Sequence, residues 1–549
     1  MVNPAALLAS VLAVMVFAAP QSTSAAPDNA FSPISAARIK ADVAMLASDA
    51  FAGRGPGEPG EVRTIAFLQR QMQRAGLQPG GPGGQWLQAV PLVRLDRAPG
   101  ALLTLTRNGV PRALVLGRDA TLGLRNPGHT VLADLPLVFA GYGVVGTFGG
   151  KTWDAYRGVA MAGKIAVVLA NDPDFDAGAD LGFEARRMVV AGRVGSKVEA
   201  AARAGAAGVL VIHEDAAASY PWGQVGSGDA LPAMASAPLK PSALQFSGWL
   251  SSAVAADLLG AANLDLAALK TRSRVPGFTA FALPGTLSAS AKLNATPVTS
   301  HNVIGRITGA RHPDEAILYG AHWDANGRNG PDASGDAIRN GAIDNAAGTA
   351  ELLEVARAFA RGPRRARSLV FAAWTAEEKG LLGSEFYAAN PAVALARTVA
   401  VINLDPHVVL PAARSLELIG GGRTPLENDL RTAAASLGLT LVDEPNPEAG
   451  WYFRSDHYPF TRRGVPALAF RAGRDLVHGS FARGNAIVAA YNQRDYHQPS
   501  DTFDAAWDFA GTAQEASAAF RVGNRLANSR DWPRWNPGNE FETLRAEAP

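Results

Sequence analysis

The sequence contains no cysteine among its 549 residues. A disulfide framework, a thiolate zinc site, a cysteine nucleophile and a lipid anchor on cysteine are therefore all excluded. Any metal ion that the protein binds must be held by histidine, aspartate and glutamate. The absence of cysteine does not place the protein in a compartment, because many exported proteins fold without disulfides.

The chain also lacks an excess of charge of either sign. Lys and Arg together number 51 and Asp and Glu 49, which leaves a formal net charge of +2. This balance gives no electrostatic argument for binding to nucleic acid or to an anionic membrane surface, so we expect neither partner. With 48% hydrophobic and 18% charged residues, the composition is that of a globular protein, and the length favours two or three domains.

No apolar run reaches the ~20 residues that a membrane-spanning helix needs. The N-terminal run, 5–19, is interrupted only by Ser10 and is followed by the small residues Ser22 to Ala26. This order is typical of a secretory signal, although the residues before the run include no Lys or Arg. We therefore predict a signal peptide over 1–26 and an exported protein, periplasmic or secreted, with no membrane anchor after cleavage.

The remaining sequence divides by its pattern of apolar residues. Helical spacing predicts two helices within 32–80. Residues 131–285 hold short apolar runs, among them Gly208-Val-Leu-Val-Ile, and an alanine-rich helical stretch from Val198. From Asn302 onward, strand-like runs alternate with helical ones, which predicts a mainly parallel sheet covered by helices. In such sheets, ligands lie beyond the carboxyl ends of the strands.

Acidic residues and histidines follow the apolar runs of this last part. The segments, in chain order, are Gly320-Ala-His322-Trp-Asp324, Asp344-Asn-Ala-Ala-Gly, Glu377-Glu378-Lys-Gly-Leu-Leu-Gly-Ser384, Asn403-Leu-Asp405 and Tyr496-His497-Gln-Pro-Ser-Asp501. Taken singly, each has a plain structural interpretation, such as a helix cap, a solvated turn or a hydrogen-bonding histidine. Those interpretations do not explain why such residues end successive strands.

Together these segments resemble the di-zinc aminopeptidase family that includes aminopeptidase Y and the bacterial leucyl aminopeptidases. The family's pattern is Gly-x-His-x-Asp, Asp-Asn-x-x-Gly, Glu-Glu-x-Gly-x-x-Gly-Ser, Asn-x-Asp and His-x-x-x-Asp, and the chain has all five in order. The early region from Leu46 through Arg54 to Pro59-Gly-Glu also resembles the family's N-terminal helix pair. Residues 163–214 resemble a protease-associated domain. One departure is Pro406, where the family often has Met.

The resemblance implies a fold and an order of domains. The expected fold is α/β, with a mainly parallel sheet sandwiched by helices as in zinc exopeptidases and an inserted, small, β-rich protease-associated domain. The expected segments are a signal peptide over 1–26, the N-terminal part of the peptidase domain over 27–130, the protease-associated insertion over 131–285, the catalytic di-zinc domain over 286–530 and a C-terminal tail over 531–549.

The resemblance also implies two zinc ions per chain and five ligands. His322, Asp344 and Asp405 would hold one ion. Asp344, Glu378 and His497 would hold the other, so that Asp344 bridges the pair. Zinc accepts imidazole nitrogen and carboxylate oxygen, and two ions ~3.5–4 Å apart need a bridging group. Three carboxylate ligands and a bridging hydroxide would neutralise the four positive charges.

Three further residues receive catalytic roles from the resemblance. Glu377 would be the general base, Asp324 would orient His322, and Tyr496 would stabilise the oxyanion. Metal ions lower the pKa of water from ~15.7 toward ~7, but a base must still carry its proton to the leaving amine. In an extended segment, Asp324 points to the same side as His322. The implied function is removal of N-terminal residues from peptide substrates.

Related functions stay open at this point. A carboxypeptidase or dipeptidase of the glutamate carboxypeptidase type resembles the same layout. A glutaminyl cyclase resembles the fold but uses one zinc, and a full set of five ligands argues against it. A non-catalytic binding protein, as the transferrin receptor is in this fold, would have lost ligands that this chain keeps. The oligomeric state and the preferred substrate side chain are not set by the sequence.

Two other groups of residues have alternative interpretations. His407 lies two positions after an expected ligand and is the main rival for a place in the metal site. Trp451, Tyr452 and Phe453 either pack in the core or form an aromatic wall beside the substrate, with Arg454 near it.

Overall fold

The computed structural model describes residue 1, residues 34–229 and residues 231–545. Apart from Met1, the predicted signal peptide lies outside these described residues. Among the helices of the described part, none is long and apolar enough to cross a membrane.

A parallel four-stranded core organises the C-terminal half of the chain. The strands β14 (His312–His322), β17 (Arg367–Trp374), β18 (Thr398–Asn403) and β21 (Ala467–Ala472) pair side by side in the order β17, β14, β18, β21. An antiparallel strand extends each side: β13 (Phe281–Ile307) pairs with β17, and β19 (Ser415–Leu418) pairs with β21. The predicted α/β fold with a mainly parallel sheet is confirmed.

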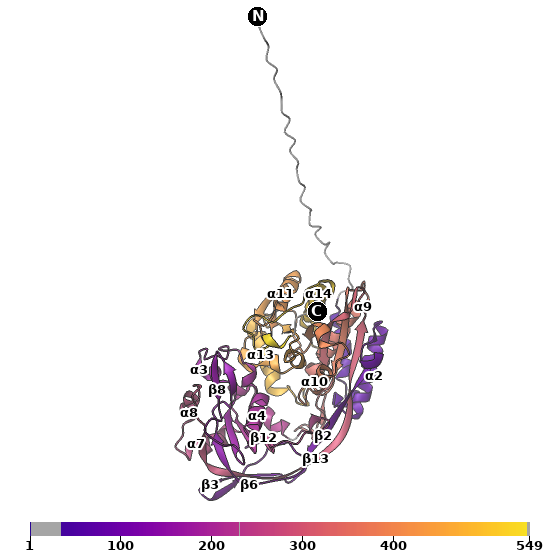
Figure 1. Ribbon diagram of the computed structural model, residues 1–549. Coiled ribbons are helices and arrows are strands. Elements are labelled where there is room, and N and C mark those ends of the chain that lie inside the picture. The colour runs from indigo at the N-terminus through magenta and orange to yellow at the C-terminus, as the bar shows by residue number, and fades with distance from the viewer. Residues whose placement is uncertain (2–33, 230, 546–549) are drawn as a thin grey trace.

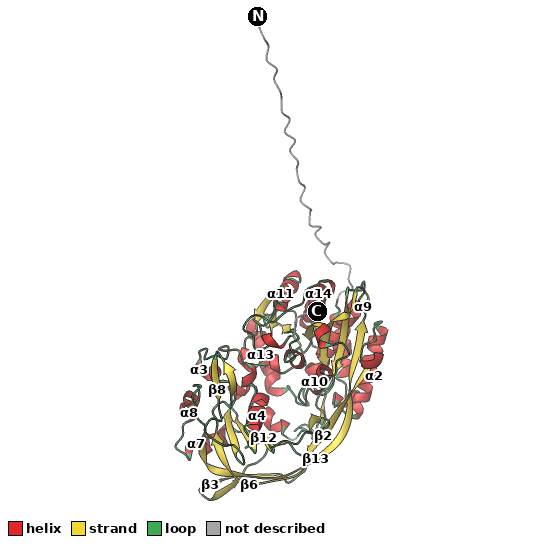
Figure 2. Cartoon of the chain, viewed as in Figure 1, coloured by secondary structure: helices red, strands yellow, loops and turns green. Residues whose placement is uncertain are grey.

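Helices cover both faces of this sheet (Figures 1 and 2). One face shares its core with α1 (Ala36–Leu46), α2 (Pro59–Arg74), α9 (Gly348–Ala360) and α14 (Ala510–Asn528). The opposite face packs against α10 (Leu382–Ala389) and α12 (Tyr458–Thr461). The two helices predicted within 32–80 are thus α1 and α2, and they belong to the same core as the C-terminal half.

Strand β17 shows why its sequence is apolar throughout. Leu369, Phe371 and Ala373 face the core with α9 and α14, whereas Val370 and Trp374 face the core with α10. Successive side chains of a strand point to opposite faces, so a strand covered on both faces needs apolar residues at every position. The polar residues that follow such a run therefore stand out at the edge of the sheet.

A second lobe has its own parallel strands and its own core. Strands β6 (Gly128–Phe139), β9 (Ile165–Leu169), β10 (Gly208–Ile212) and β12 (Phe246–Leu250) pair in this order. Helix α4 (Val194–Arg203) covers the sheet, as the alanine-rich pattern predicted. The core of the lobe also includes Leu103 and Leu105 of β3 (Leu102–Arg107), so the lobe draws on residues before 131. The protease-associated resemblance and the domain boundaries stay predictions.

One long strand, β13 (Phe281–Ile307), joins the two lobes (Figure 1). Its first half pairs with β6 in the second lobe, and its second half pairs with β2 (Leu87–Arg97) and then with β17. The lobes are therefore connected by a continuous hydrogen-bonded sheet rather than by a flexible linker. Their spacing, and the space between them, is set by that sheet.

The packing of α14 on the central sheet depends on a glycine. A Cβ atom at Gly523 would lie 1.6 Å from the hydroxyl oxygen of Tyr319, which is fully buried on β14 and donates to the carbonyl of Ala519. We expect Gly523→Ala to destabilise the fold by about 1–3 kcal/mol, because an added methyl group forces the helix away from the sheet. Urea unfolding followed by circular dichroism measures this loss.

Gly260→Ala is the matched control, since no atom lies within 4 Å of a Cβ added at the end of α7 (Ser252–Gly260). Equal unfolding midpoints for the two variants would contradict the close contact between α14 and β14.

Candidate functional site

The chemistry-bearing residues gather at the carboxyl ends of the central strands. His322 is the last residue of β14, Glu377 and Glu378 follow β17, and Asp405 follows β18 by two residues. Because these strands are parallel neighbours, their carboxyl ends meet at one edge of the sheet. Two further segments reach the same edge: the turn that precedes α9 and the turn that follows α13 (Phe481–Arg494).

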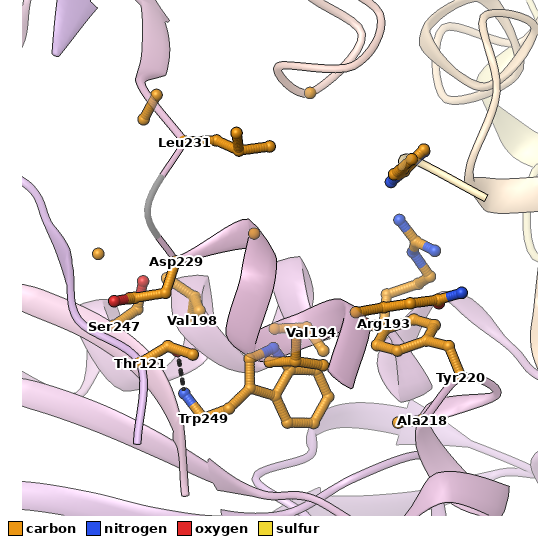
Figure 3. Close-up of a pocket in the computed structure, with 18 of the residues that line it drawn as sticks. Thr121, Arg193, Val194, Val198, Ala218, Tyr220, Asp229, Leu231, Ser247 and Trp249 are labelled. Carbon is orange, nitrogen blue, oxygen red and sulfur yellow. Dashed lines mark hydrogen bonds between the residues drawn. The ribbon is translucent and has the colours of Figure 1, made fainter. Parts of the chain in front are cut away.

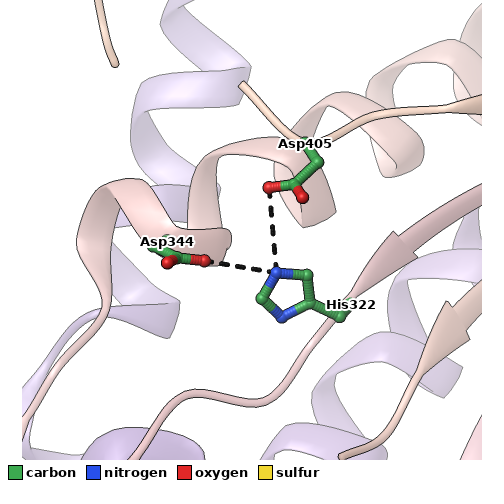
Figure 4. Close-up of side chains that lie close together, drawn as sticks. All are labelled: His322, Asp344 and Asp405. Atoms are coloured by element: carbon green, nitrogen blue, oxygen red, sulfur yellow. Dashed lines mark ion pairs between the residues drawn. The ribbon is translucent and has the colours of Figure 1, made fainter. Parts of the chain in front are cut away.

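At this edge the five predicted metal ligands form two groups of donor atoms. The first group contains His322, Asp344 and Asp405 (Figure 4), and the second contains Asp344, Glu378 and His497. Within each group the donor atoms lie within 4.8 Å of one another. The structure therefore brings all five residues together, and Asp344 belongs to both groups.

The two oxygens of Asp344 face different histidines. Its Oδ1 lies 3.2 Å from Nε2 of His322, and its Oδ2 lies 3.1 Å from Nε2 of His497. Asp405 Oδ1 completes the first group at 3.8 Å from Nε2 of His322, and Glu378 Oε2 the second at 3.1 Å from Nε2 of His497. Imidazole nitrogen and carboxylate oxygen at these positions are the donor set of a divalent transition-metal site, so the residues fit zinc.

The charges in the site shift one another's pKa values. Burial opposes the ionised form of Asp344, but hydrogen bonds to His322 and His497 outweigh it and hold its pKa below the usual range. Burial likewise opposes the charged form of His322, yet the carboxylates around it raise its pKa well above the ordinary value. Burial raises the pKa of Glu378 to about 7. The shifts follow from burial and from the close carboxylate–imidazole contacts of the site.

Glu377 lies next to both donor groups without belonging to either. Its Oε2 is 3.9 Å from Nε2 of His322, and its side chain lines both cavities described below. The preceding residue, Ala376, has a φ of 54°, so the chain turns directly after β17 and before Glu377. Burial raises the pKa of Glu377 well above that of an ordinary carboxyl group, which favours proton uptake.

Asp324 contacts more than the histidine that it was expected to orient. Nδ1 of His322 lies 3.1 Å from the backbone carbonyl of Asp324 and 3.7 Å from its Oδ1. The same Oδ1 accepts a hydrogen bond from the backbone N–H of Glu377 at 3.1 Å. Asp324 therefore connects the strand end of His322 to the turn that carries Glu377.

Tyr496 stacks on the neighbouring ligand candidate. Its ring centroid lies 3.8 Å from that of His497, and its side chain lines both cavities. Burial raises its pKa well above the usual value, so its hydroxyl group keeps the proton and stays a hydrogen-bond donor.

Sequence reasoning gave no role to two residues that hold the ligand candidates. Asp501 accepts hydrogen bonds from the backbone N–H groups of Ile343 (3.0 Å) and Asp344 (3.1 Å). Ser455 donates its hydroxyl proton to Oδ2 of Asp405 at 2.5 Å. The His-x-x-x-Asp motif was a signal for Asp501, whereas nothing in the sequence pointed to Ser455.

The rival histidine lies outside both donor groups. His407 contacts Asn492 through Nε2 and lies 4.2 Å from the ring of Trp451. The aromatic residues after position 450 follow both interpretations, an aromatic wall and core packing. Trp451 lines a cavity, while Tyr452 and Phe453 are buried in a core cluster.

Two cavities adjoin the donor groups. The larger, of about 590 Å³, lies between the lobes and is lined by Glu377 and His497 on one side and by residues of the second lobe on the other (Figure 3). The smaller, of about 60 Å³, is lined by Asp344, Asp405 and Trp451 among others. A peptide that entered the larger cavity would meet the donor groups at its wall.

Two arginines line the larger cavity without a carboxylate partner. Neither Arg193 of the second lobe nor Arg454 forms an ion pair with a described residue. Arg454 donates to the carbonyl of Ala218 at 3.2 Å and lies over the rings of Trp451 and Tyr220. Burial, with the nearby charge of Arg454, lowers the pKa of Arg193 to about 10, so it stays protonated at neutral pH. The two guanidinium groups suit an anionic group bound in this cavity.

Comparisons with known proteins agree with the fold. The chain is similar to a solved structure, an aminopeptidase from Aneurinibacillus sp. strain AM-1, with 19% identity and a TM-score of 0.54 over 91% of this chain and 95% of that one. This likeness supports the α/β fold.

Curated relatives share parts of the sequence. Aminopeptidase NAALADL1 of Mus musculus is 36% identical over 277 residues, which are 45% of this chain and 34% of that protein. A probable zinc metalloprotease of Pyrenophora teres f. teres is 40% identical over 109 residues, 20% of this chain and 23% of that protein. The chain thus spans about a third or less of the length of these relatives.

A family match covers the part of the chain that holds the site. Residues 302–521 match the family described as Peptidase family M28. This range contains the strand ends and both turns that form the two donor groups. The part of the chain that carries both donor groups is therefore similar to peptidase family M28.

Proposed function

We propose that this protein is an exported, zinc-dependent exopeptidase that acts as an aminopeptidase. The observation that carries the proposal is the pair of donor groups that share the carboxylate of Asp344. Two groups with one shared ligand support two zinc ions per chain, with His322 and Asp405 on one side and Glu378 and His497 on the other. The name of the fungal relative, a probable zinc metalloprotease, supports the choice of metal.

When bound, zinc supplies Lewis-acid polarisation of the scissile carbonyl and makes water acidic enough to attack near neutral pH. The carboxylate of Glu377 accepts a proton from the attacking water and then delivers that proton to the leaving amine. Tyr496 donates its hydroxyl proton in a hydrogen bond to the oxyanion that forms. Asp324 holds the His322 ring and the turn that carries Glu377 at a fixed distance from each other.

The preference for the amino end has separate support. Carboxylates line the cavity wall beside the donor groups, and an ionised carboxylate can hold the free α-amine of a substrate. The name of the mouse relative, an aminopeptidase, agrees with this choice. The signal-like N-terminal sequence supports export to the periplasm or the medium. The retained donors favour this enzyme over a non-catalytic binding protein.

A carboxypeptidase or dipeptidase of the glutamate carboxypeptidase type is the second candidate. Arg193 and Arg454 favour it, because two guanidinium groups without carboxylate partners suit the C-terminal carboxylate of a short peptide. The cavity of about 590 Å³ is large enough to hold such a substrate.

Blocking either end of a peptide separates the two candidates. We expect N-terminal acetylation to abolish cleavage, because the acetylated nitrogen no longer carries the charge that the carboxylates would bind. C-terminal amidation should have a smaller effect. Chromatography of the products measures both rates. Equal cleavage of acetylated and free peptides, together with loss of cleavage on amidation, would assign the carboxypeptidase function instead.

Glu377→Gln tests the general base. The variant should bind zinc as the wild type does but lose about 10²–10⁴-fold in kcat, since glutamine cannot accept the proton. Steady-state kinetics and elemental analysis of the same sample measure both properties. Glu199→Gln on the exposed side of α4 is the control and should leave both unchanged. A near-normal kcat for Glu377→Gln would remove Glu377 from this role.

Asp344→Asn tests the shared ligand. Because both groups include this carboxylate, the variant should lose zinc from both positions, where the wild type should hold about two ions per chain. Elemental analysis after dialysis counts them, and Asp314→Asn at the exposed start of β14 is the control. Full occupancy in Asp344→Asn, or a single ion retained at wild-type affinity, would rule out the bridging role.

A further inference from the structure

Arg54 is a fully buried arginine in a segment remote in sequence from the donor groups. It ends the short helix η1 (Asp49–Arg54) with a φ of 49°, directly after Ala52 and Gly53, which also have positive φ. Non-glycine residues adopt this left-handed conformation only when surrounding contacts compensate for the strain. The contacts that compensate here are made by the guanidinium group of Arg54.

The guanidinium donates only to backbone carbonyls. Its four hydrogen bonds reach Leu46 (2.9 Å), Trp323 (2.7 Å), Asn340 (2.6 Å) and Gly341 (2.7 Å). Leu46 ends α1, but the other three acceptors belong to the site.

Those acceptors lie beside two of the candidate ligands. Trp323 stands between His322 and Asp324, and Gly341 stands three residues before Asp344. One side chain thus ties together two backbone segments whose ligands are 22 positions apart in the sequence.

The segment before the shared carboxylate is held from its other side by Asp501. The carboxylate of Asp501 accepts the N–H groups of Ile343 and Asp344, and its backbone carbonyl accepts that of Ala342 at 3.1 Å. Arg54 therefore binds the carbonyls of this turn and Asp501 binds its amides. Between them they fix the backbone that places both oxygens of Asp344.

Arg54 also brings an uncompensated charge into the site. It forms no ion pair with a described residue, although its charge acts on Asp501, Asp324, Asp344 and Glu378. Burial lowers its pKa to about 10, so it is still protonated at neutral pH. A buried cation that serves only packing is costly relative to an apolar side chain. Because the positive charge of Arg54 lies near several carboxylates, it reduces the repulsion between them.

We propose that Arg54 is a positioning residue for the zinc site, which sets the spacing between His322 and Asp344 through backbone carbonyls. The inference rests on the proposed function, because it assumes that the two donor groups bind zinc. It also makes the segment around residues 46–54, which lies outside the family match at 302–521, a working part of the site.

Zinc affinity, measured by competition with a chromophoric chelator on the full chain, tests the role without a need for turnover. Arg54→Met should bind zinc about 10–100-fold more weakly, the usual loss when a residue that supports the ligands is removed. Arg54→Lys keeps the charge but cannot reach four carbonyls at once. We therefore expect its zinc affinity to fall by about 3–10-fold, to a value between those of the wild type and Arg54→Met.

Arg367→Met is the matched control. Arg367 is also fully buried and donates to the carbonyls of Leu526 and Asp531, but its partner carboxylate is Glu315, at the far end of β14 from His322. Its loss should lower the thermal unfolding midpoint and leave zinc affinity within about twofold of the wild type. A merely structural role for Arg54 would give the same pattern.

The outcomes separate the two proposals. Wild-type zinc affinity in Arg54→Lys, or in a folded Arg54→Met, would overturn the positioning role while the proposed function stands. If Arg54→Met does not fold, Arg54→Lys alone decides. A wild-type protein that binds no zinc would instead overturn the proposed function itself.

Discussion

Two groups of donor atoms meet at a single carboxylate, and the arrangement of the site depends on that meeting. Each carboxylate oxygen of Asp344 contacts a different histidine, His322 or His497. Both contacts form only if the backbone of Asp344 is held in one position and orientation. A carboxylate that rotated freely would lose its contact with one of the two histidines. The turn before α9 therefore has to be rigid even though it belongs to no strand.

Rigidity comes from contacts on both sides of that turn. The carboxylate of Asp501 accepts hydrogen bonds from N–H groups of the turn, and Arg54 donates hydrogen bonds to its carbonyls. Side chains thus satisfy the backbone polar groups that a turn leaves unpaired. These two residues come from opposite ends of the chain. The N-terminal helices, the central sheet and the C-terminal turn consequently have to assemble before the donor atoms reach their distances.

The second lobe contributes to the site in a different way. It supplies no donor atom to either group, but the long strand β13 holds it opposite the sheet edge and leaves a cavity of about 590 Å³ between them. Glu377 and Glu378 line this cavity beside the donor groups, Arg193 lines it from the second lobe, and Arg454 lines both this cavity and the smaller one. A zwitterionic peptide would meet carboxylates and guanidinium groups there, and the second lobe supplies one of those groups.

The sequence by itself predicted the α/β class, the alternation of strands and helices after Asn302 and the five residues whose donor atoms the structure brings together. Apolar runs mark strands buried on both faces, and polar residues after such runs mark a common edge, as β17 and the Glu377-Glu378 pair illustrate. Only the tertiary structure decided which atoms lie close together. It placed His407 against Trp451 and outside the donor groups, showed that Asp324 accepts the N–H of Glu377, and brought Arg54, Arg193 and Ser455 to the site. The physical reason is that periodicity reports how a side chain is buried by its own element, whereas hydrogen bonds to backbone groups and the walls of a cavity depend on segments that are distant in the chain and leave no local pattern.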